Sequence, residues 1–208
     1  MKIDRDEMLR YMGVRGSGEG VDAKALAEAE SLCLAAAVPK SVVKEYEFDC
    51  KTMDVVGTNV SFKGKDIARH LQGCERVFLL AATLGMGIDM LTSRLARENP
   101  VLAVMVDAAA VSLIESFLDD VCDGIAKECG GSLTTRFSCG YGDFPLEQQR
   151  DFVRLLDMNR KLGVFLGENL LMTPMKSVTA VVGVGGDSAT ECAGKCASCE
   201  SENCAYRK

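Results

Sequence analysis

A single long helix constrains the fold of this chain more than any other segment. The sequence predicts that it runs from Pro100 to about Glu128, because proline suits the first turn of a helix and Gly130-Gly131 suit the positions beyond its end. Its apolar residues recur at alternating steps of four and three residues: Val104, Ala108, Val111, Leu118 and Cys122. This spacing places them on one face, which we expect to be directed at the core.

The rest of the chain mixes predicted helices and strands without regular alternation. We expect a short helix near the N-terminus and further helices at residues 23–38, 65–72, 88–97 and 146–157. We expect a hairpin over residues 41–62 with its turn at residues 57–59, and extended segments at residues 76–84, 134–141, 163–171 and 177–184. This order favours an α+β fold: a single domain over residues 1–184 with a mainly antiparallel, twisted sheet flanked by helices, then a Cys-rich tail over residues 185–208.

Composition and charge exclude several classes of protein. The 208 residues suffice for one well-cored domain, and a net charge of -6 without a basic run argues against nucleic acid as a partner. The N-terminus lacks the apolar core of a signal peptide, and the apolar stretch from Val77 to Leu91 contains Asp89 and is too short to span a bilayer. We therefore expect a cytoplasmic protein without a membrane partner.

One acidic residue interrupts the apolar face of the long helix. Glu115 falls in the same series of steps as Val111 and Leu118. A carboxylate is costly to bury alone, so Glu115 is either paired with a cation or exposed in a cleft where a ligand supplies the partner. A helix rotated enough to leave Glu115 at the edge of the core fits the pattern equally well.

The segment from Arg136 to Leu146 combines an arginine, two glycines, a tyrosine and an aspartate in a strand leaving the sheet. Glycine allows the backbone to approach a ligand closely, and arginine offers a rigid fork for a carboxylate. We interpret it as a loop for a small zwitterion. The alternative is a β-bulge and turn with an exposed arginine.

Three ordered motifs carry a resemblance to a known family: Leu113–Phe117, Arg136–Tyr141 and Met172–Ala180. Together they resemble the activation domain of cobalamin-dependent methionine synthase, in the form found as a separate polypeptide. The resemblance covers roughly residues 75–184, and three motifs in order are more specific than one.

The resemblance implies a site for S-adenosylmethionine. In it Arg136 holds the methionine carboxylate, Glu115 supplies a polar contact, the backbone of Ser138 and Gly140 lines the ligand, and Tyr141 lies close to the sulfonium. It also implies reductive methylation: transfer of the methyl group to cobalamin traps the reduced cobalt and reactivates the corrinoid protein. The partners are then a corrinoid-binding protein or the methionine synthase itself, and an electron-donor protein.

The chain departs from the family at three places. Cys139 replaces a proline, and past Val184 the family's continuing segment, which brings further tyrosines to the ligand, is replaced by the tail. The cobalt-ligating D-x-H-x-x-G motif is missing, because Ala68 stands two residues before His70, the only histidine. We therefore expect His70 to be a surface helix residue and cobalamin to be carried by a partner.

The tail contains four cysteines in thirteen residues: Cys192, Cys196, Cys199 and Cys204. Four thiolates this close can converge on zinc or an iron–sulfur cluster, and a cluster could supply the electron for reactivation. A reduced tail or two local disulfides are the alternatives.

Two other functions are compatible with these motifs. The first three tail cysteines match C-x3-C-x2-C, the cluster motif of radical S-adenosylmethionine enzymes, although only nine residues follow Cys199. A small zinc-tailed interaction protein without methyl chemistry is the other.

Overall fold

The computed structural model describes residues 1–14 and 20–185 and centres on a five-stranded antiparallel sheet. The strand order is β3-β2-β1-β4-β7. The strands are β1 (Lys40–Asp49), β2 (Asp54–Val55), β3 (Val60–Ser61), β4 (Cys74–Thr83) and β7 (Ser177–Gly185). A separate two-stranded sheet pairs β5 (Phe165–Leu166) with β6 (Met172–Thr173). The expected α+β class and mainly antiparallel sheet are confirmed.

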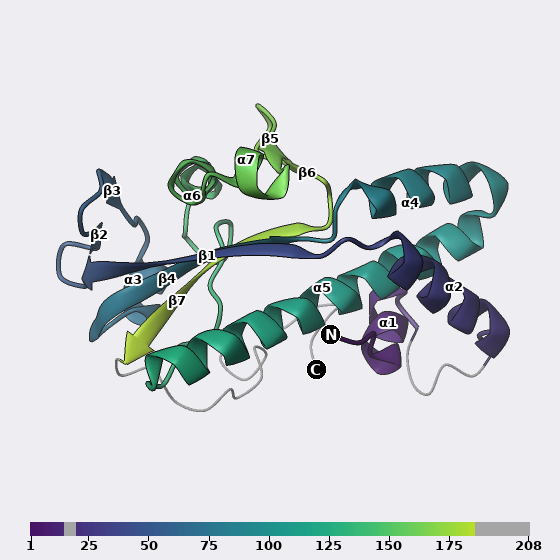
Figure 1. Cartoon of the computed structure of the whole chain (residues 1–208), viewed down its shortest axis with the longest axis horizontal. Helices are drawn as coiled ribbons and strands as arrows, with labels where there is room; N and C mark the ends of the chain where they lie inside the picture. The colour runs from purple at the N-terminus through teal and green to yellow at the C-terminus, as the bar shows by residue number, and fades with distance from the viewer. Residues whose placement is uncertain (15–19, 186–208) are drawn as a thin grey trace.

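Helices cover both faces of the sheet (Figure 1). One layer contains α1 (Arg5–Tyr11), α2 (Ala23–Ala36), α4 (Met86–Glu98) and α5 (Pro100–Cys129). The other contains α3 (Lys65–His70), α6 (Gln149–Leu156) and α7 (Met158–Leu162), with a short 3-10 turn at Leu146–Gln148 before α6.

Side-chain alternation along β4 divides the core into two apolar clusters. Phe78, Leu80 and Ala82 pack with the α5 layer, whereas Val77, Leu79 and Ala81 pack with the α3, α6 and α7 layer. Successive strand residues point to opposite faces, so a continuous apolar strand can serve two cores at once.

The long helix α5 forms where the sequence predicts it, but its expected core face is only partly right: Ala108 and Leu118 are buried as expected. Val104 is 55% exposed, while Leu102, Met105, Val106 and Ala109 are buried. Val104, Val111 and the edge of Ala108 line an open pocket of about 520 Å³ with Tyr11 and part of α4. Apolar residues surround most of this helix, so spacing alone did not fix which face meets the sheet.

The apolar character of α5 is also that of a helix that could span a membrane. By length and composition this helix could cross a membrane, but 61% of its most apolar window is buried inside the protein. Such burial is what a core helix requires.

The expected hairpin and two expected extended segments differ from the strands that the structure contains. The hairpin over residues 41–62 contains a second turn, at residues 50–53, besides the confirmed turn between β2 and β3. Only Phe165–Leu166 of the expected strand at residues 163–171 is a strand. Residues 134–141 form no ladder; one isolated bridge to β7 is at Phe137, and a second is just before this segment, at Leu133.

The approach of residues 133–137 to β7 requires a glycine at position 183. A Cβ at Gly183 would lie 2.5 Å from Cys74 Sγ, 2.9 Å from Leu71 Cδ2 and 3.3 Å from Thr134 Cγ2. The backbone N–H of Gly183 donates to Thr134 Oγ1 at 2.9 Å, and the N–H of Thr134 donates to the Gly183 carbonyl at 3.0 Å. The missing side chain therefore lets Thr134 dock directly on the strand.

We predict that Gly183→Ala lowers the free energy of unfolding by about 1–3 kcal/mol, because an added methyl overpacks this contact. Denaturant unfolding monitored by circular dichroism measures the change. Gly124→Ala is the matched control: a Cβ there has no neighbour within 4 Å. It should raise stability by about 1 kcal/mol, since alanine favours a helix interior. Wild-type stability in Gly183→Ala would contradict the proposed close packing.

Candidate functional site at the sheet edge

The predicted site lies where residues 133–137 extend the sheet beyond β7. The N–H of Phe137 donates to the Val181 carbonyl at 3.0 Å, and the N–H of Val181 donates back to the Phe137 carbonyl at 2.8 Å. The Phe137 side chain packs with the cluster on the α3 and α6 side. Because neighbouring residues of an extended segment face opposite sides, Arg136 projects toward α5.

Arg136 is held by two carboxylates of α5. Its Nη2 donates to Glu115 Oε2 at 2.8 Å, and its Nη1 donates to Asp119 Oδ1 at 2.6 Å. Cys122 Sγ lies 3.8 Å from Nη1. These three residues stand on one face of α5, because helical positions four and seven apart are stacked.

Burial and charge oppose each other at Arg136, whose side chain is only 10% exposed. Burial alone would lower the pKa of Arg136, but hydrogen bonds and attraction from Asp119 and Glu115 outweigh it and raise the pKa. The guanidinium therefore stays charged. The neighbouring Cys122 thiol has its pKa raised mainly by burial, which keeps it protonated.

The structure decides between the alternatives for Glu115. Its partner is a cation of the protein, Arg136, and its side chain is 32% exposed, at the edge of the core. The role of Arg136 as a fork for a ligand carboxylate stays a prediction. Both of its terminal nitrogens bind carboxylates of the chain itself.

The N-terminal segment forms a second side of the site, which the sequence analysis missed. The N–H of Asp4 donates to Ser112 Oγ at 2.8 Å, and the N–H of Lys2 donates to Ser116 Oγ at 3.0 Å. These serines flank Glu115 along α5. In the sequence, the two serines, four residues apart in an apolar helix, could have indicated that another segment binds there.

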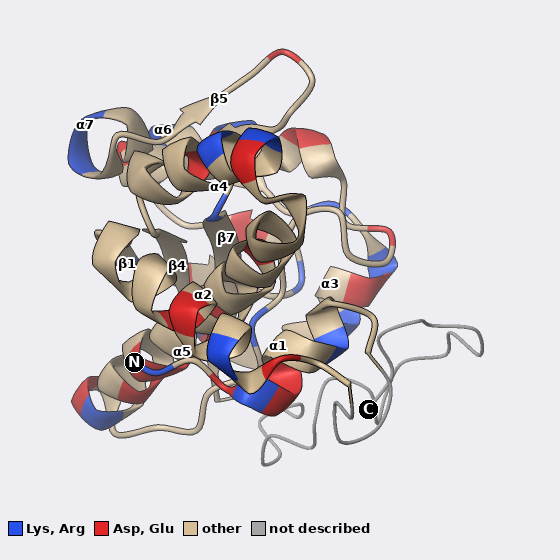
Figure 2. Cartoon of the chain, turned by 90° about the vertical axis from the view of Figure 1, so that its right-hand side faces the viewer, with Lys and Arg blue, Asp and Glu red and all other residues tan. Residues whose placement is uncertain are grey.

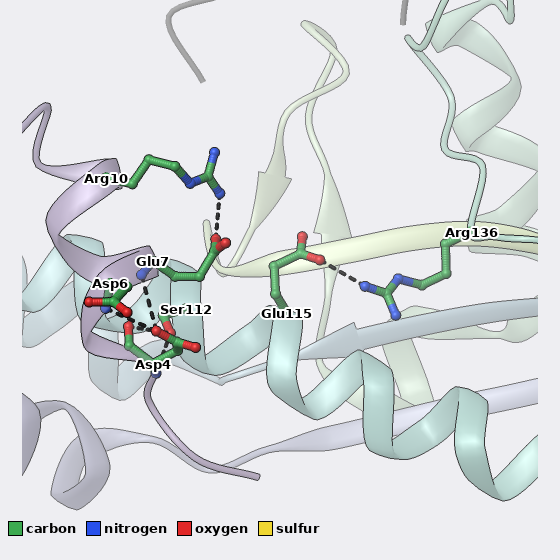
Figure 3. Close-up of polar contacts among 7 residues, drawn as sticks. All are labelled: Asp4, Asp6, Glu7, Arg10, Ser112, Glu115 and Arg136. Atoms are coloured by element: carbon green, nitrogen blue, oxygen red, sulfur yellow. Dashed lines mark hydrogen bonds and ion pairs between the residues drawn. The ribbon is translucent and has the colours of Figure 1, made fainter. Parts of the chain in front are cut away.

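Figure 3 shows Glu115 between Arg136 on one side and the paired Glu7 and Arg10 of α1 on the other. Figure 2 shows acidic and basic segments side by side on α1. Burial raises the pKa of Tyr11, while the charge of Arg10 lowers it and the charge of Glu115 raises it. The surroundings of Glu115 are thus charged on two sides.

The remaining predicted residues, Ser138, Gly140 and Tyr141, share one tight loop. The N–H of Tyr141 donates to the Ser138 carbonyl at 3.1 Å, and the N–H of Gly140 donates to the Phe144 carbonyl at 2.8 Å. Gly140 has a φ of 89°, which favours glycine. Tyr141 is 53% exposed and meets the Phe137 ring edge-on at 6.1 Å. The loop therefore begins next to Arg136, and Tyr141 within it packs against Phe137, whose side chain faces away from Arg136.

Two aspartates bind this loop to α3. The backbone N–H groups of Lys65 and Asp66 donate to the Asp143 carboxylate at 2.7 and 3.0 Å, and the N–H of Asp143 donates to Asp66 Oδ2 at 3.2 Å. A Cβ on Gly64 would lie 2.7 Å from Asp143 Oδ1, and one on Gly142 would lie 2.2 Å from Asp66 Oδ2. We call Asp66 and Asp143 the loop clamp.

His70 was expected on the surface, and this expectation is wrong in part. It ends α3, but its ring is half-buried, 4.9 Å from the Phe137 ring, and its Nε2 lies 2.8 Å from the Thr135 carbonyl. Burial lowers the pKa of His70. A neutral ring with a proton on Nε2 donates to this carbonyl. His70 thus supports the segment that carries Arg136.

Residues 1–14 and 20–185 contain no group of three or more Cys, His, Asp or Glu arranged to hold a metal ion. The predicted ligands Cys192, Cys196, Cys199 and Cys204 lie outside the described residues. The tail metal site, and the division into a domain and a tail at residue 185, therefore stay predictions.

Comparison with known proteins gives a match in structure and none in sequence. No protein-family profile and no curated protein matches the sequence. A crystal structure of the MetH reactivation domain bound to AdoHcy superposes with a TM-score of 0.67 and 16% sequence identity. The match covers 91% of this chain and 76% of that chain. The chain therefore has the fold of the MetH reactivation domain.

We predict that Asp143→Ala speeds amide hydrogen exchange at Lys65 and Asp66 several-fold, because both N–H groups lose their acceptor. Exchange measured by nuclear magnetic resonance checks this. Asp151→Ala removes another carboxylate, one that pairs with Arg154 within α6, and should leave these two amides unchanged. Unchanged exchange in Asp143→Ala would show that the clamp does not protect α3.

The clamp should also depend on pH. Hydrogen bonds from the N–H groups of Asp66 and Lys65 lower the pKa of Asp143 below its usual value of 3.8. The folded state therefore binds fewer protons at this group than the unfolded state. The contribution of the Asp143 carboxylate to the free energy of unfolding is complete above pH 3.8. It is lost as the pH falls through the lowered pKa.

Proposed function

We propose that this chain binds S-adenosylmethionine at the Arg136 edge and supplies its methyl group to cobalamin carried by a partner. The partner is a cobalamin-dependent methionine synthase or another corrinoid-binding protein, in the cytoplasm. The observation that carries the proposal is the shared fold with a reactivation domain bound to AdoHcy, which is what S-adenosylmethionine becomes after losing its methyl group. The proposal makes the chain a methyl-transfer component.

The residues of the edge suit the three parts of this ligand. Arg136 supplies a fixed guanidinium for the methionine carboxylate, and Glu115 supplies a carboxylate for the ammonium or sulfonium charge. Tyr141 offers an exposed aromatic face to the sulfonium, and the tight turn from Ser138 to Gly140 lets backbone approach the ligand. The contacts of the adenosine are left unassigned.

The acidic half of α5 supports a cationic ligand. Besides Glu115 it carries Asp119 and Asp123 toward its C-terminal end, while Asp120 pairs with the N-terminal ammonium of Met1 at 2.5 Å. S-adenosylmethionine has one carboxylate and two positive groups, so a site with one arginine and several carboxylates complements its charge.

The chemistry proposed for the site requires one electron and one methyl group. A donor protein reduces cob(II)alamin to cob(I)alamin; the electron pair of cobalt then forms a bond to the methyl carbon while the carbon–sulfur bond breaks. S-adenosylhomocysteine leaves with the former bonding pair on sulfur. The role of this chain is to hold the sulfonium so that the methyl group is in line with cobalt, since proximity supplies most of the acceleration.

The cysteine tail enters the proposal as a metal site. Cys192, Cys196, Cys199 and Cys204 would hold zinc or an iron–sulfur cluster, and a cluster there would be a route for the electron.

The test is to mix the purified chain with a corrinoid protein in the cob(II) state, add reductant and S-adenosylmethionine, and follow the visible spectrum. We expect the methylcobalamin spectrum to appear only when all components are present. Binding without methylation but with release of 5′-deoxyadenosine would support a radical enzyme instead. Absence of S-adenosylmethionine binding would support a small zinc-tailed interaction protein without methyl chemistry.

We predict that Arg136→Ala weakens binding of S-adenosylmethionine by about 2 kcal/mol or more, because a charge-assisted contact is lost. Isothermal titration calorimetry measures the affinity. Arg154→Ala removes an exposed arginine paired with Asp151 on α6 and is the control for net charge. Equal affinities of the two variants would remove Arg136 from the site.

We also predict that deletion of residues 187–208 leaves folding and ligand binding intact, because β7, the last described strand, ends at Gly185. Circular dichroism and calorimetry on the shortened chain test this. The deletion should abolish the metal content that elemental analysis finds in the full chain. Loss of soluble expression would show that the tail is structural.

A further inference from the structure

We infer that Asp119 is an internal competitor for the carboxylate of the ligand and so sets the affinity of the site for carboxylate-bearing ligands. This inference rests on the proposed function. It assigns Asp119 a role separate from that of Glu115, although both residues bind the same guanidinium.

The two carboxylates differ in how firmly the fold holds them. The Glu115 side chain is 32% exposed and lies between Arg136 and α1, as Figure 3 shows. The Asp119 side chain is 68% exposed, one turn nearer the C-terminal end of α5. Asp119 can turn into solvent at small cost, because water replaces most of what it loses. Glu115 is the anchor of the pair.

The position of Asp119 on Arg136 matches what a ligand carboxylate requires. Asp119 Oδ1 accepts from Nη1 at 2.6 Å, so it occupies one of the two terminal nitrogens of the guanidinium. A ligand carboxylate that binds Nη1 in the same way must displace Asp119. Arg136 is 10% exposed. Of the two carboxylates that bind it, Asp119 is more exposed than Glu115.

Exchange of Asp119 for a ligand carboxylate changes little in charge. One carboxylate leaves Nη1 and another takes its place, so the buried guanidinium keeps two negative neighbours throughout. The competition costs the ligand only the ion pair of Asp119, whose carboxylate is 68% exposed and screened by water, although the guanidinium is 10% exposed. For a pair with one exposed partner we expect a factor of about two to five in the dissociation constant.

The test measures dissociation constants by calorimetry with the full-length wild-type chain and variants, using two ligands. For S-adenosylmethionine we expect Asp119→Asn to bind about two- to fivefold more tightly than the wild type. For the decarboxylated form of S-adenosylmethionine we expect no tightening, because this ligand does not compete with Asp119. The difference between the ligands isolates the competition from a general effect of the substitution.

Asp123→Asn is the matched control. Asp123 is an exposed carboxylate one turn further along α5, so its replacement makes the same change in charge. Loss of negative charge alone should slightly weaken binding of a cationic ligand. Tightening in Asp119→Asn and not in Asp123→Asn therefore identifies contact with Arg136 as the cause.

The outcomes separate this inference from the proposed function. Wild-type binding of S-adenosylmethionine with unchanged or weaker binding by Asp119→Asn would overturn the inference alone; the ligand would then use other donors of Arg136. Equal tightening for both ligands would also overturn it. Absence of binding by the wild type would overturn the proposed function and the inference with it.

Discussion

The ion pairs of Arg136 with Glu115 and Asp119 join two parts of the fold that no strand ladder connects. Arg136 lies in an irregular segment beside β7, and its partners lie on α5. A guanidinium that is 10% exposed is stable only with charged partners, so the segment and the helix are fixed relative to each other. The loop that follows Arg136 therefore starts from a fixed position.

The loop beyond Arg136 is held by apolar packing of Cys139 and Phe144 and by hydrogen bonds to α3. The clamp of Asp66 and Asp143 ties its far end to α3, and the glycines at positions 64 and 142 permit the approach. Phe137 and His70 pack beneath the near end. Tyr141 is consequently exposed on a loop that is supported at both ends, an arrangement that suits recognition of a small ligand.

Charge is the basis of the selectivity that we propose for the site. A single buried arginine among the carboxylates of α5 and the pair of Glu7 and Arg10 on α1 favours a ligand with both a carboxylate and positive groups. The shared fold with the MetH reactivation domain and the composition of this edge are independent observations, and the proposed function draws on both.

The sequence by itself determined most element types, the α+β class and the limits of α5, because proline, glycine and apolar alternation act locally. It also identified Glu115 and Arg136 as unusual, since charge in an apolar pattern is visible in one dimension. Only the tertiary structure decided that these two side chains pair, that Asp119 shares Arg136, and that the N-terminal segment binds Ser112 and Ser116. Each of these depends on contacts between residues far apart in the chain. The phase of α5 was likewise undecided, because residues such as Leu102 and Val104 are equally apolar and only the surrounding layers determine which is covered.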